Sequence, residues 1–502
     1  MTTTTARTAA PAAPTRRGTR WADLAVAGAC LVHLWLCWRL RGFVTDDSWI
    51  SVRYAENLAA GHGFVWNPGG PAVEGASNPL LVGLEALAAL AGLPALRTAR
   101  VLGVVAGVTC VLLVGLRGRV LAGAPAAAVG ALLVGCSAPF AAWAVGGLET
   151  LLVAAVLTTA VLELARPRGG SAALAGGALA LLPWLRPEGL VVAAAVVACS
   201  EGPGLLRSAT RRAALRRCAW VVAVPVASQA VLEAGRLLVH GHLLPNSVLY
   251  KSGTGEGATV LVKFLEQGAL VVVLAAAGTA LATGRARLLA VAPLVHAVGS
   301  LGTLDSANGY SRFFMPVWPQ LALLAGVAVA ALLALRGRWG RPAAAATSAA
   351  TAAVSAALLL AGPGAERAVR SSAQEYTACK VAAREGVAAW LRTTPPGTVF
   401  AVSDAGLVPA RAGGRTAVDS FLLNDPLIQE TGPLPSAQRA RIVLERGPDV
   451  LVLVSREAGR FVAGYPTDAR LHELGTASGY RLQHVSSGRG AGCRYHLTAL
   501  AR

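Results

Sequence analysis

Charged residues are scarce in this chain of 502 residues, where they make up 14% of the sequence against 54% hydrophobic residues. This composition holds far more apolar surface than one soluble core requires, which excludes an ordinary soluble globular protein. Acidic residues are fewer than basic ones, with 26 Asp and Glu against 45 Lys and Arg, and the formal net charge is +19. The basic residues occur in short clusters between apolar runs, a pattern typical of membrane orientation, so nucleic acid is not an expected partner.

Motifs for metals and nucleotides are also missing. The sequence has no CxxC pair, no His-rich spacing and no glycine-rich phosphate loop ahead of a helix. We therefore expect no metal site and no cofactor, although a divalent metal stays compatible with the chemistry that the residues indicate.

The long apolar runs predict an α-helical multi-pass membrane protein with about 11 spans. Residues 1–20 are expected to be a disordered cytoplasmic tail, and residues 21–40 an uncleaved signal anchor. Basic clusters then alternate with apolar runs, so the odd number of crossings predicts a cytoplasmic N-terminus and an extracytoplasmic C-terminus. The expected spans are 21–40, 96–116, 120–138, 148–165, a broken pair over 171–200, 219–239, 259–282, 288–301, 314–335 and 343–361.

Three regions follow from this organisation: the tail 1–20, a transmembrane domain 21–361 with a first extracytoplasmic loop 41–95, and an extracytoplasmic domain 362–502. In the last region helical patterns alternate with β-rich runs over 398–404 and 448–455, which predicts a small α/β domain. Of eight cysteines, Cys379 and Cys493 lie in this region. A disulfide between them is expected from the even number and the oxidising compartment.

Two adjacent carboxylates, Asp46 and Asp47, follow the first span. If Asp46 opens a helix, then Arg53 and Asn57 lie within about 20° of it, whereas Asp47 is turned away by about 100°. The two aspartates should therefore have different roles. The simpler alternative is a helix cap supplied by Thr45 or Asp46.

The segment 171–200 breaks the pattern of plain spans. Two apolar arms, each too short to cross a membrane, flank Pro183, Arg186, Pro187 and Glu188. Broken helices occur where charges line a cavity, so this segment is a candidate wall of a site. A plain hairpin whose tip reaches water is the alternative.

The loops predicted on the outer side share an unusual content of cations, which runs against the positive-inside bias and suggests an anionic ligand. Cations can stabilise a phosphate leaving group while a carboxylate deprotonates an acceptor hydroxyl. Glu74, Asn78 and Asp305 are explained equally well as loop-stabilising residues. The expected site residues are Asp46, Asp47, Arg53, Glu149, Arg186, Glu188, Asn246, Tyr250, Lys251 and Arg312.

Several motifs in one order carry a family resemblance. They are TDDSWISVRYAENLAAGHGFVWNPG from Thr45, VEGASNP, GLET, RPEG, LLPNSVLYKSG, SRFFMP and VSDAGLVPARAGGRTAVDSFLLNDP. The chain resembles the C-type glycosyltransferases that use polyprenyl-phosphate sugars, in particular terminal arabinofuranosyltransferases of cell-wall arabinan. The resemblance implies a donor of the decaprenyl-phosphate arabinofuranose type, an extracytoplasmic active site and an essential aspartate in the first loop. Ala76 stands where an aromatic residue is expected, and VPARAGGR lacks tyrosines, so transfer of mannose or another pentose stays open.

The sequence thus predicts a glycosyltransferase of the cell membrane that moves a sugar from a polyprenyl-phosphate donor to a glycan acceptor outside the bilayer. Asp46 is the first choice for the acid that acts on the acceptor hydroxyl, and Asp47 orders the loop or shares that role. Lys251, Arg312 and Arg186 are expected at the phosphate. A transporter or flippase of a lipid-linked sugar is the alternative, but charges that gather at one face favour an enzyme. A membrane anchor with a glycan-binding tail would leave the charged loops unexplained.

Overall fold

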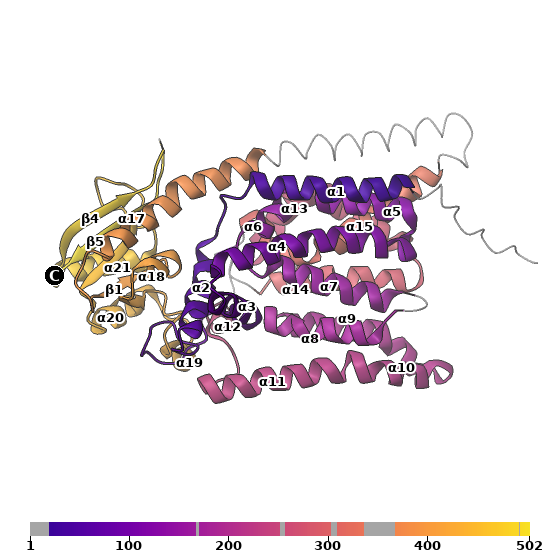
Figure 1. Cartoon of the computed structure of the whole chain (residues 1–502), viewed down its shortest axis with the longest axis horizontal. Coiled ribbons are helices and arrows are strands. Elements are labelled where there is room, and N and C mark those ends of the chain that lie inside the picture. Colours follow the sequence, from indigo (N-terminus) through magenta and orange to yellow (C-terminus); the bar gives the residue numbers. More distant parts are fainter. Residues whose placement is uncertain (1–19, 167–169, 252–256, 303–308, 336–366, 491) are drawn as a thin grey trace, which may run out of the picture.

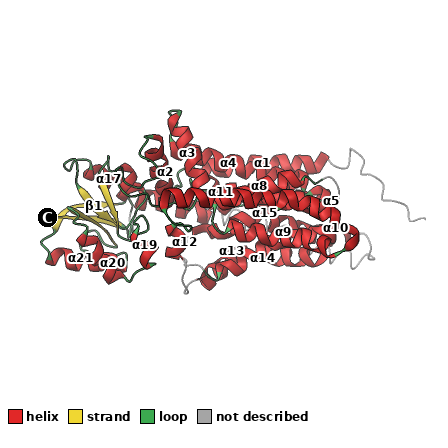
Figure 2. Cartoon of the chain, turned by 90° about the horizontal axis from the view of Figure 1, so that it is seen from below, coloured by secondary structure: helices red, strands yellow, loops and turns green. Residues whose placement is uncertain are grey.

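The computed structural model describes residues 20–166, 170–251, 257–302, 309–335, 367–490 and 492–502. The predicted span 343–361, the tail 1–19 and Asp305 lie outside these ranges. Most described residues are helical, and the long helices run side by side in a bundle with a β-sheet beyond one end of it (Figure 1). The sheet and its helices follow the bundle along the longest axis of the molecule (Figure 2).

The bundle is built from helices whose apolar residues face both neighbouring helices and the surroundings. Its helices are α1 (Arg20–Arg39), α4 (Ala95–Leu112), α5 (Arg119–Gly135), α7 (Thr150–Ala165), α8 (Ala172–Leu185), α9 (Gly189–Leu206), α10 (Ser208–Val221), α11 (Ala223–His240), α13 (Gly257–Leu281), α14 (Val291–Ser300) and α15 (Trp318–Leu335). Glycines allow close approach: a Cβ at Gly278 would collide with the carbonyl oxygen of Leu324, and one at Gly326 with that of Ala126.

Six helical stretches in the described residues are long and apolar enough to cross a membrane. They are Arg20–Arg39, Ala95–Arg117, Gly189–Leu206, Ser208–His240, Ala258–Leu281 and Tyr310–Ala334, and these apolar helices identify a membrane protein. The number of about 11 spans stays a prediction.

Two of the expected spans differ in form from the prediction. The expected span 120–138 ends at Gly135 and bends by 57° into α6 (Ala138–Val145). The expected span 288–301 contains only ten residues of α-helix, because a 3₁₀ helix (Gly284–Ala290) precedes α14. The predicted break in 171–200 is present between α8 and α9.

The chain also contains shorter helices. They are α2 (Asp46–Ala59) and α3 (Pro79–Leu90) in the first loop, α12 (Asn246–Lys251), and the 3₁₀ helix η4 (Gly309–Val317). A helix over 367–375 continues as a π-helical turn (Tyr376–Val381) into α17 (Ala382–Leu391) and leads to the C-terminal region.

The C-terminal region contains a five-stranded mixed sheet in the order β2-β1-β3-β5-β4. β1 pairs in parallel with β2 and β3, and β5 runs antiparallel to β3 and β4. The strands are β1 (Val399–Val402), β2 (Thr416–Asp419), β3 (Val450–Ser455), β4 (Arg481–Ser487) and β5 (His496–Ala501). The remaining helices are α18 (Leu407–Arg411), α19 (Leu427–Thr431), α20 (Ser436–Glu445) and α21 (Pro466–Ala477).

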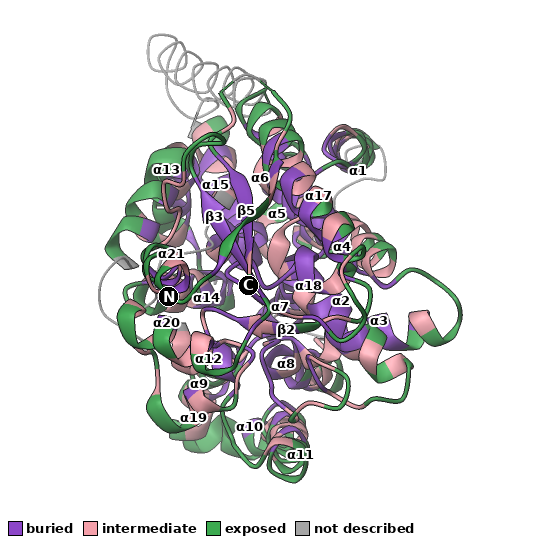
Figure 3. Ribbon diagram, turned by 90° about the vertical axis from the view of Figure 1, so that its left-hand side faces the viewer, coloured by how far each residue is buried: buried purple, intermediate pink, exposed green. Residues whose placement is uncertain are grey.

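The two faces of this sheet belong to two different hydrophobic clusters. Alternate residues of a strand point to opposite faces, so Leu451 and Leu453 of β3 pack with α20 and α21. Val450 and Val452 point the other way and share a cluster with α17 and with side chains of the first loop, including Trp49. Viewed from this end of the molecule, the central strands are buried (Figure 3). The first loop is therefore part of the core of the C-terminal region.

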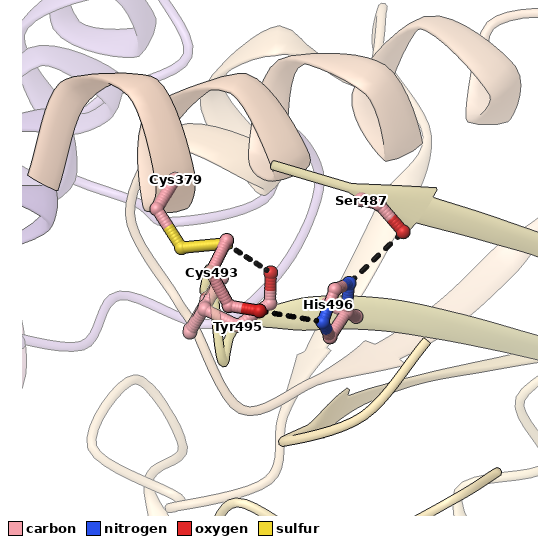
Figure 4. The surroundings of a disulfide bond; sticks show 5 residues. All are labelled: Cys379, Ser487, Cys493, Tyr495 and His496. Carbon is pink, nitrogen blue, oxygen red and sulfur yellow. Dashed lines mark hydrogen bonds between the residues drawn. A yellow bond between two sulfur atoms is a disulfide. The ribbon is translucent and has the colours of Figure 1, made fainter. Parts of the chain in front are cut away.

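The predicted disulfide between Cys379 and Cys493 is confirmed, with the two Cα atoms 5.6 Å apart (Figure 4). It ties the π-helical turn before α17 to the connection between β4 and β5. His496 is the first residue of β5, and its ring nitrogens lie 2.9 Å from Ser487 Oγ and 3.1 Å from the Cys493 carbonyl oxygen.

Candidate functional site

The helix α2 begins at the two adjacent aspartates and presents them to different surroundings. Asp46 faces the C-terminal region, where its carboxylate accepts hydrogen bonds from the backbone N–H groups of Gly406, at 3.1 Å, and Leu407, at 3.0 Å. The Arg384 guanidinium lies 3.3 Å from the same carboxylate and 2.8 Å from Asp404. The Asp46 side chain is only 14% exposed, and these contacts make it a docking contact between the first loop and the C-terminal region.

The electrostatics of Asp46 reflect this enclosed position. Burial raises the pKa of the Asp46 carboxyl to about 6, while Arg384 acts in the opposite direction and Asp404 adds to the rise. Tyr376 bonds to both Asp46 and Arg384. Its hydroxyl accepts a hydrogen bond from the Asp46 backbone N–H at 3.0 Å and another from Arg384 at 2.9 Å.

Arg53 and Asn57 lie on the Asp46 face of α2, as the helical spacing predicted, and both bind backbone. Arg53 donates to the carbonyl oxygens of Trp66, at 2.6 Å, and Pro409, while Asn57 donates to those of Val65 and Trp66. Arg53 therefore links the first loop to the C-terminal region, whereas Asn57 holds the backbone of the loop itself.

Two further expected site residues make the same kind of contact. Asn246 donates to the carbonyl oxygens of Leu423 and Asp425, and Tyr250 accepts a hydrogen bond from Arg439 at 3.1 Å. Both attach α12 to the C-terminal region. The Lys251 side chain lies outside the described part of the structure.

Five of the expected residues meet in a continuous charge cluster, which comprises Asp47, Arg312, Glu149, Arg186 and Glu188. Arg312 lies 3.0 Å from Asp47 and 3.3 Å from Glu149. Arg186 lies 3.6 Å from the same Glu149 oxygen and 2.5 Å from Glu188. The centre of the cluster is buried, with Glu149 1% exposed and Arg312 7%, whereas Asp47 is 42% exposed. The charges at the centre of the cluster are therefore buried, whereas the Asp47 carboxylate at its edge is exposed.

The members of the charge cluster stand at or next to the ends of helices. Asp47 stands in the first turn of α2, Arg186 and Glu188 stand between α8 and α9, and Glu149 immediately precedes α7. Gly147 supports this approach, because it adopts a left-handed φ of 82° and a Cβ there would lie 3.0 Å from the Ser48 Cβ. Helix ends from distant parts of the sequence therefore converge on one point.

The backbone before Arg312 is strained. Tyr310 and Ser311 have φ of 52° and 55°, a left-handed conformation that costs about 1–3 kcal/mol in a residue other than glycine. Ser311 donates a hydrogen bond to Gln267 at 2.7 Å, which helps to fix the turn. Strain of this kind persists where the surrounding structure holds a side chain in place, and here that side chain is Arg312.

Neutral side chains complete the surroundings of the charge cluster. Asn78 donates to Glu149 at 2.8 Å and accepts from Ser51 at 3.0 Å. The Arg312 guanidinium lies 5.4 Å from the ring of Trp143, and that of Arg186 lies 5.2 Å from the ring of Phe313. Aromatic faces support the positive charges without neutralising them.

The two arginines keep buried donors without acceptors. Nε of Arg312 and Nη1 of Arg186 have no hydrogen-bond partner among the described residues, although Nη1 of Arg186 is the atom that lies 3.6 Å from the Glu149 carboxylate. A buried donor left unsatisfied costs about 1–3 kcal/mol. An anion placed between the two guanidinium groups would supply the missing acceptors.

Glu85 is a neighbouring acid that the sequence prediction missed. Its carboxyl on α3 is fully buried, and neither oxygen has a hydrogen-bond partner in the described structure. Burial, followed by the charges of Glu149 and Glu56, raises the Glu85 pKa well above its ordinary value. A charged residue inside the otherwise apolar run 79–90 was the available sequence signal.

Three more residues of the site region were not among the expected site residues. Asn78, which the sequence explained equally well as a loop residue, is bonded to the charge cluster. Arg384 and Tyr376, which hold Asp46, gave no signal because they lie more than 300 positions away in the sequence. In the described ranges no group of three or more His, Cys, Asp or Glu residues is arranged to hold a metal ion.

Comparisons with known proteins relate this geometry to other folds. A family model described as a domain of unknown function (DUF8728) matches residues 368–497. No curated protein matches the chain.

Solved structures match nearly the whole chain. ArnT from Cupriavidus metallidurans bound to undecaprenyl phosphate aligns with a TM-score of 0.58 at 14% identity, covering 96% of this chain and 98% of ArnT. The archaeal oligosaccharyltransferase AglB from Archaeoglobus fulgidus, in complex with an inhibitory peptide and a dolichol-phosphate, aligns with a TM-score of 0.54 at 12% identity, covering 87% of this chain and 70% of AglB. The chain therefore has the fold of ArnT and AglB, which are GT-C glycosyltransferases.

Proposed function

We propose that this protein transfers a sugar from a polyprenyl-phosphate donor to a cell-envelope glycan, with arabinofuranose as the favoured sugar. The charge cluster carries the proposal, because it combines an exposed carboxylate with two buried guanidinium groups, each of which has one nitrogen without a hydrogen-bond partner among the described residues. The two similar structures support the donor class, since ArnT was solved bound to undecaprenyl phosphate and AglB in complex with a dolichol-phosphate. The motif resemblance supports the choice of sugar.

Arg312 and Arg186 are the proposed ligands of the donor phosphate. A guanidinium group offers several N–H donors in a plane, and its pairing with phosphate is short and charge-assisted. The two arginines share the Glu149 carboxylate, and each also pairs with a second acid, Asp47 for Arg312 and Glu188 for Arg186. As the bond between the sugar and the phosphate breaks, the negative charge that develops on the phosphate is stabilised by these same groups.

Asp47 is the proposed general base for the acceptor hydroxyl. A base must expose an oxygen to the proton that it removes, and the Asp47 side chain is 42% exposed beside Arg312. Asp46, the first choice from the sequence, directs its carboxylate to Gly406, Leu407 and Arg384. We therefore assign docking to Asp46 and proton removal to Asp47.

We propose that the charge cluster and the C-terminal region lie on the extracytoplasmic side and that the N-terminus lies in the cytoplasm. Arginine clusters between the helices at the opposite end of the bundle support this orientation through the positive-inside rule. A reporter that is active only outside the cytoplasm should give a signal when fused at Arg502. A signal from a cytoplasmic reporter at that position would overturn the orientation.

The direct test of the proposed function is a product assay. Purified protein is incubated with a short arabinan acceptor and with each of several polyprenyl-phosphate sugars. The mass of the acceptor is then measured by mass spectrometry. We expect a mass gain of one or more pentose units with the arabinofuranose donor. A gain with a different sugar would retain the reaction class and correct the specificity, whereas no gain with any donor would contradict the proposal.

A further inference from the structure

A large cavity lies apart from the charge cluster, between the end of α1 and the helices that lead into the C-terminal region. Its volume is about 980 Å³. One wall is formed by residues 39–43, and the other by the helix over 367–375, the π-helical turn and the start of α17. The connection between β4 and β5 adds Arg489.

The lining of this cavity is strongly basic. Its charged residues are four arginines, Arg39, Arg41, Arg370 and Arg489, and one acid, Glu385. Polar side chains of Gln374 and Thr377 lie between them. An excess of guanidinium groups over carboxylates selects an anion, and the planar guanidinium group suits a phosphate in particular.

The position of the cavity along α1 indicates the source of that anion. Trp35 and Trp38, in the last turns of α1, are 49% and 57% exposed. Arg39 and Arg41 lie over their rings, at 5.4 Å and 4.8 Å from the ring centres. Exposed tryptophans beside basic residues at the end of an apolar helix mark the membrane–water interface, where lipid headgroups are found. The cavity therefore stands at headgroup depth.

The far wall of the cavity is fixed by covalent and steric constraints. The disulfide between Cys379 and Cys493 joins the π-helical turn to the connection between β4 and β5. Next to it, the Arg489 backbone N–H donates to the Ala378 carbonyl oxygen at 2.7 Å, and a Cβ at Gly488 would collide with Cys379. Arg489 is thus held at the cavity by a rigid attachment.

An aromatic layer separates the cavity from the charge cluster. Phe43 lines the cavity, and its ring centre lies 5.8 Å from that of Trp143, which supports Arg312 on the other side. Phe43 also contacts Tyr310 and Tyr376 at 5.3 and 5.8 Å. These aromatic rings therefore stand between the cavity and the charge cluster.

We propose that this cavity binds the headgroup of an anionic phospholipid from the surrounding bilayer. Arg41 and Arg489 contact the phosphodiester from opposite walls, and the acyl chains leave along the exposed apolar face of α1. The bound lipid would join the end of α1 to the C-terminal region. This site is independent of the donor and of the reaction proposed for the charge cluster.

Native mass spectrometry of the full-length protein in detergent tests this site. The protein is titrated with phosphatidylglycerol and, separately, with phosphatidylcholine of the same acyl chains. Arg41→Ala combined with Arg489→Ala should remove one tightly bound phosphatidylglycerol per chain, with an affinity loss of at least about tenfold. Phosphatidylcholine binding should not change.

The matched control combines Arg456→Ala with Arg470→Ala, two exposed arginines of the C-terminal region that do not line the cavity, and it should keep the wild-type number of bound lipids. Arg489→Ala alone changes an exposed position and should show a smaller loss of phosphatidylglycerol affinity. This single variant tests the site even if the double variant does not fold. Equal binding by the double variant and the control would overturn the proposal. Displacement of the lipid by soluble glycerol phosphate would overturn the assignment to a bilayer lipid in favour of a free phosphate.

Discussion

Asp46 and Asp47 are neighbours in sequence, yet the helical rotation between them sends one carboxylate to backbone N–H groups and the other to a buried arginine. A carboxylate whose oxygens accept two backbone N–H bonds is well suited to hold two segments together. A carboxylate that is half exposed beside a cation can exchange a proton with a bound hydroxyl group. At the scale of single residues, the exposure of each carboxylate and its bonding partners therefore distinguish the docking role of Asp46 from the proposed catalytic role of Asp47.

Arg312 should affect both binding and turnover. In Arg312→Ala the donor phosphate loses a charge-assisted contact, and we expect donor affinity to fall at least about tenfold, with a further loss in turnover. Arg446→Ala is a matched control, because that arginine pairs with Asp425 at an exposed position. Donor affinity measured by lipid titration, separately from product formation, checks this. Unchanged affinity in a folded Arg312→Ala protein would show that the phosphate binds elsewhere.

Asp468 should make the stability of the protein depend on pH. Burial raises its pKa from 3.8 to about 7, so the folded form holds the proton more tightly than the unfolded form. The free energy of unfolding should therefore fall as pH rises from about 4 to about 7, by about 1.4 kcal/mol per pH unit within that window.

Asp468→Asn should remove the contribution of Asp468 to this pH dependence and leave that of Asp46. The amide can accept from the Val454 N–H and donate to the Ser403 hydroxyl, the two partners of the carboxylate. Thermal unfolding of the full chain in detergent between pH 4 and pH 8 compares the two proteins. Parallel pH profiles for wild type and Asp468→Asn would contradict the assignment.

At the scale of elements, the ends of helices position the charge cluster. Arg186 and Glu188 stand where α8 gives way to α9, and Arg312 stands in a strained 3₁₀ segment. Interruptions of this kind free backbone groups and let charged side chains turn toward one point. The regular parts of the same helices serve to fix the distances between these breaks.

The buried ion pair between Glu74 and Arg236 attaches the first loop to α11. The two side chains are bonded at 2.9 and 3.1 Å, and each is 5% exposed. Arg236→Met should destabilise the protein by about 3–5 kcal/mol, since it leaves Glu74 buried without its partner. Glu74→Leu combined with Arg236→Met should recover most of the loss. A thermal midpoint for Arg236→Met equal to that of the double variant would contradict this role.

Sequence reasoning predicted the elements better than the contacts between them. The helical spacing correctly placed Asp46, Arg53 and Asn57 on one face and turned Asp47 away, because a helix fixes directions locally. It could not show which face met the C-terminal region, since Arg384 and Gly406 lie more than 300 residues along the chain. The break around Arg186 was predicted from its prolines and charges. The bend between α5 and α6 was missed, although Ser137 caps α6 and Pro139 stands in its first turn.

At the scale of the whole molecule, the first loop and the C-terminal region form one unit. Trp49 of α2 shares a hydrophobic cluster with β1 and β3. The Asn67 side chain bonds to both the N–H and the carbonyl of Ala417, which covers the edge strand β2. The first loop, which precedes the predicted boundary at residue 362, thus shares a hydrophobic core with the C-terminal region, which follows it.

The disulfide should contribute to the stability of this unit. Its two cysteines are 114 positions apart, so it closes a long loop of the unfolded chain. Replacement of both cysteines by serine should cost about 2–4 kcal/mol. Cys199→Ser, at an exposed free cysteine, serves as the control. Limited proteolysis should cleave the C-terminal region of the double variant sooner, and equal cleavage rates would contradict a stabilising role.

The comparison of Asp47→Asn with Asp46→Asn tests the central claim most directly. Single-turnover product formation is measured by mass spectrometry for both variants at a temperature where each is folded, with donor affinity determined separately. We predict that Asp47→Asn lowers turnover by about 10² to 10⁴ while donor binding survives, and that Asp46→Asn keeps near-normal turnover but unfolds at a lower temperature. Near-normal turnover in Asp47→Asn, or a loss confined to folded Asp46→Asn, would contradict the account.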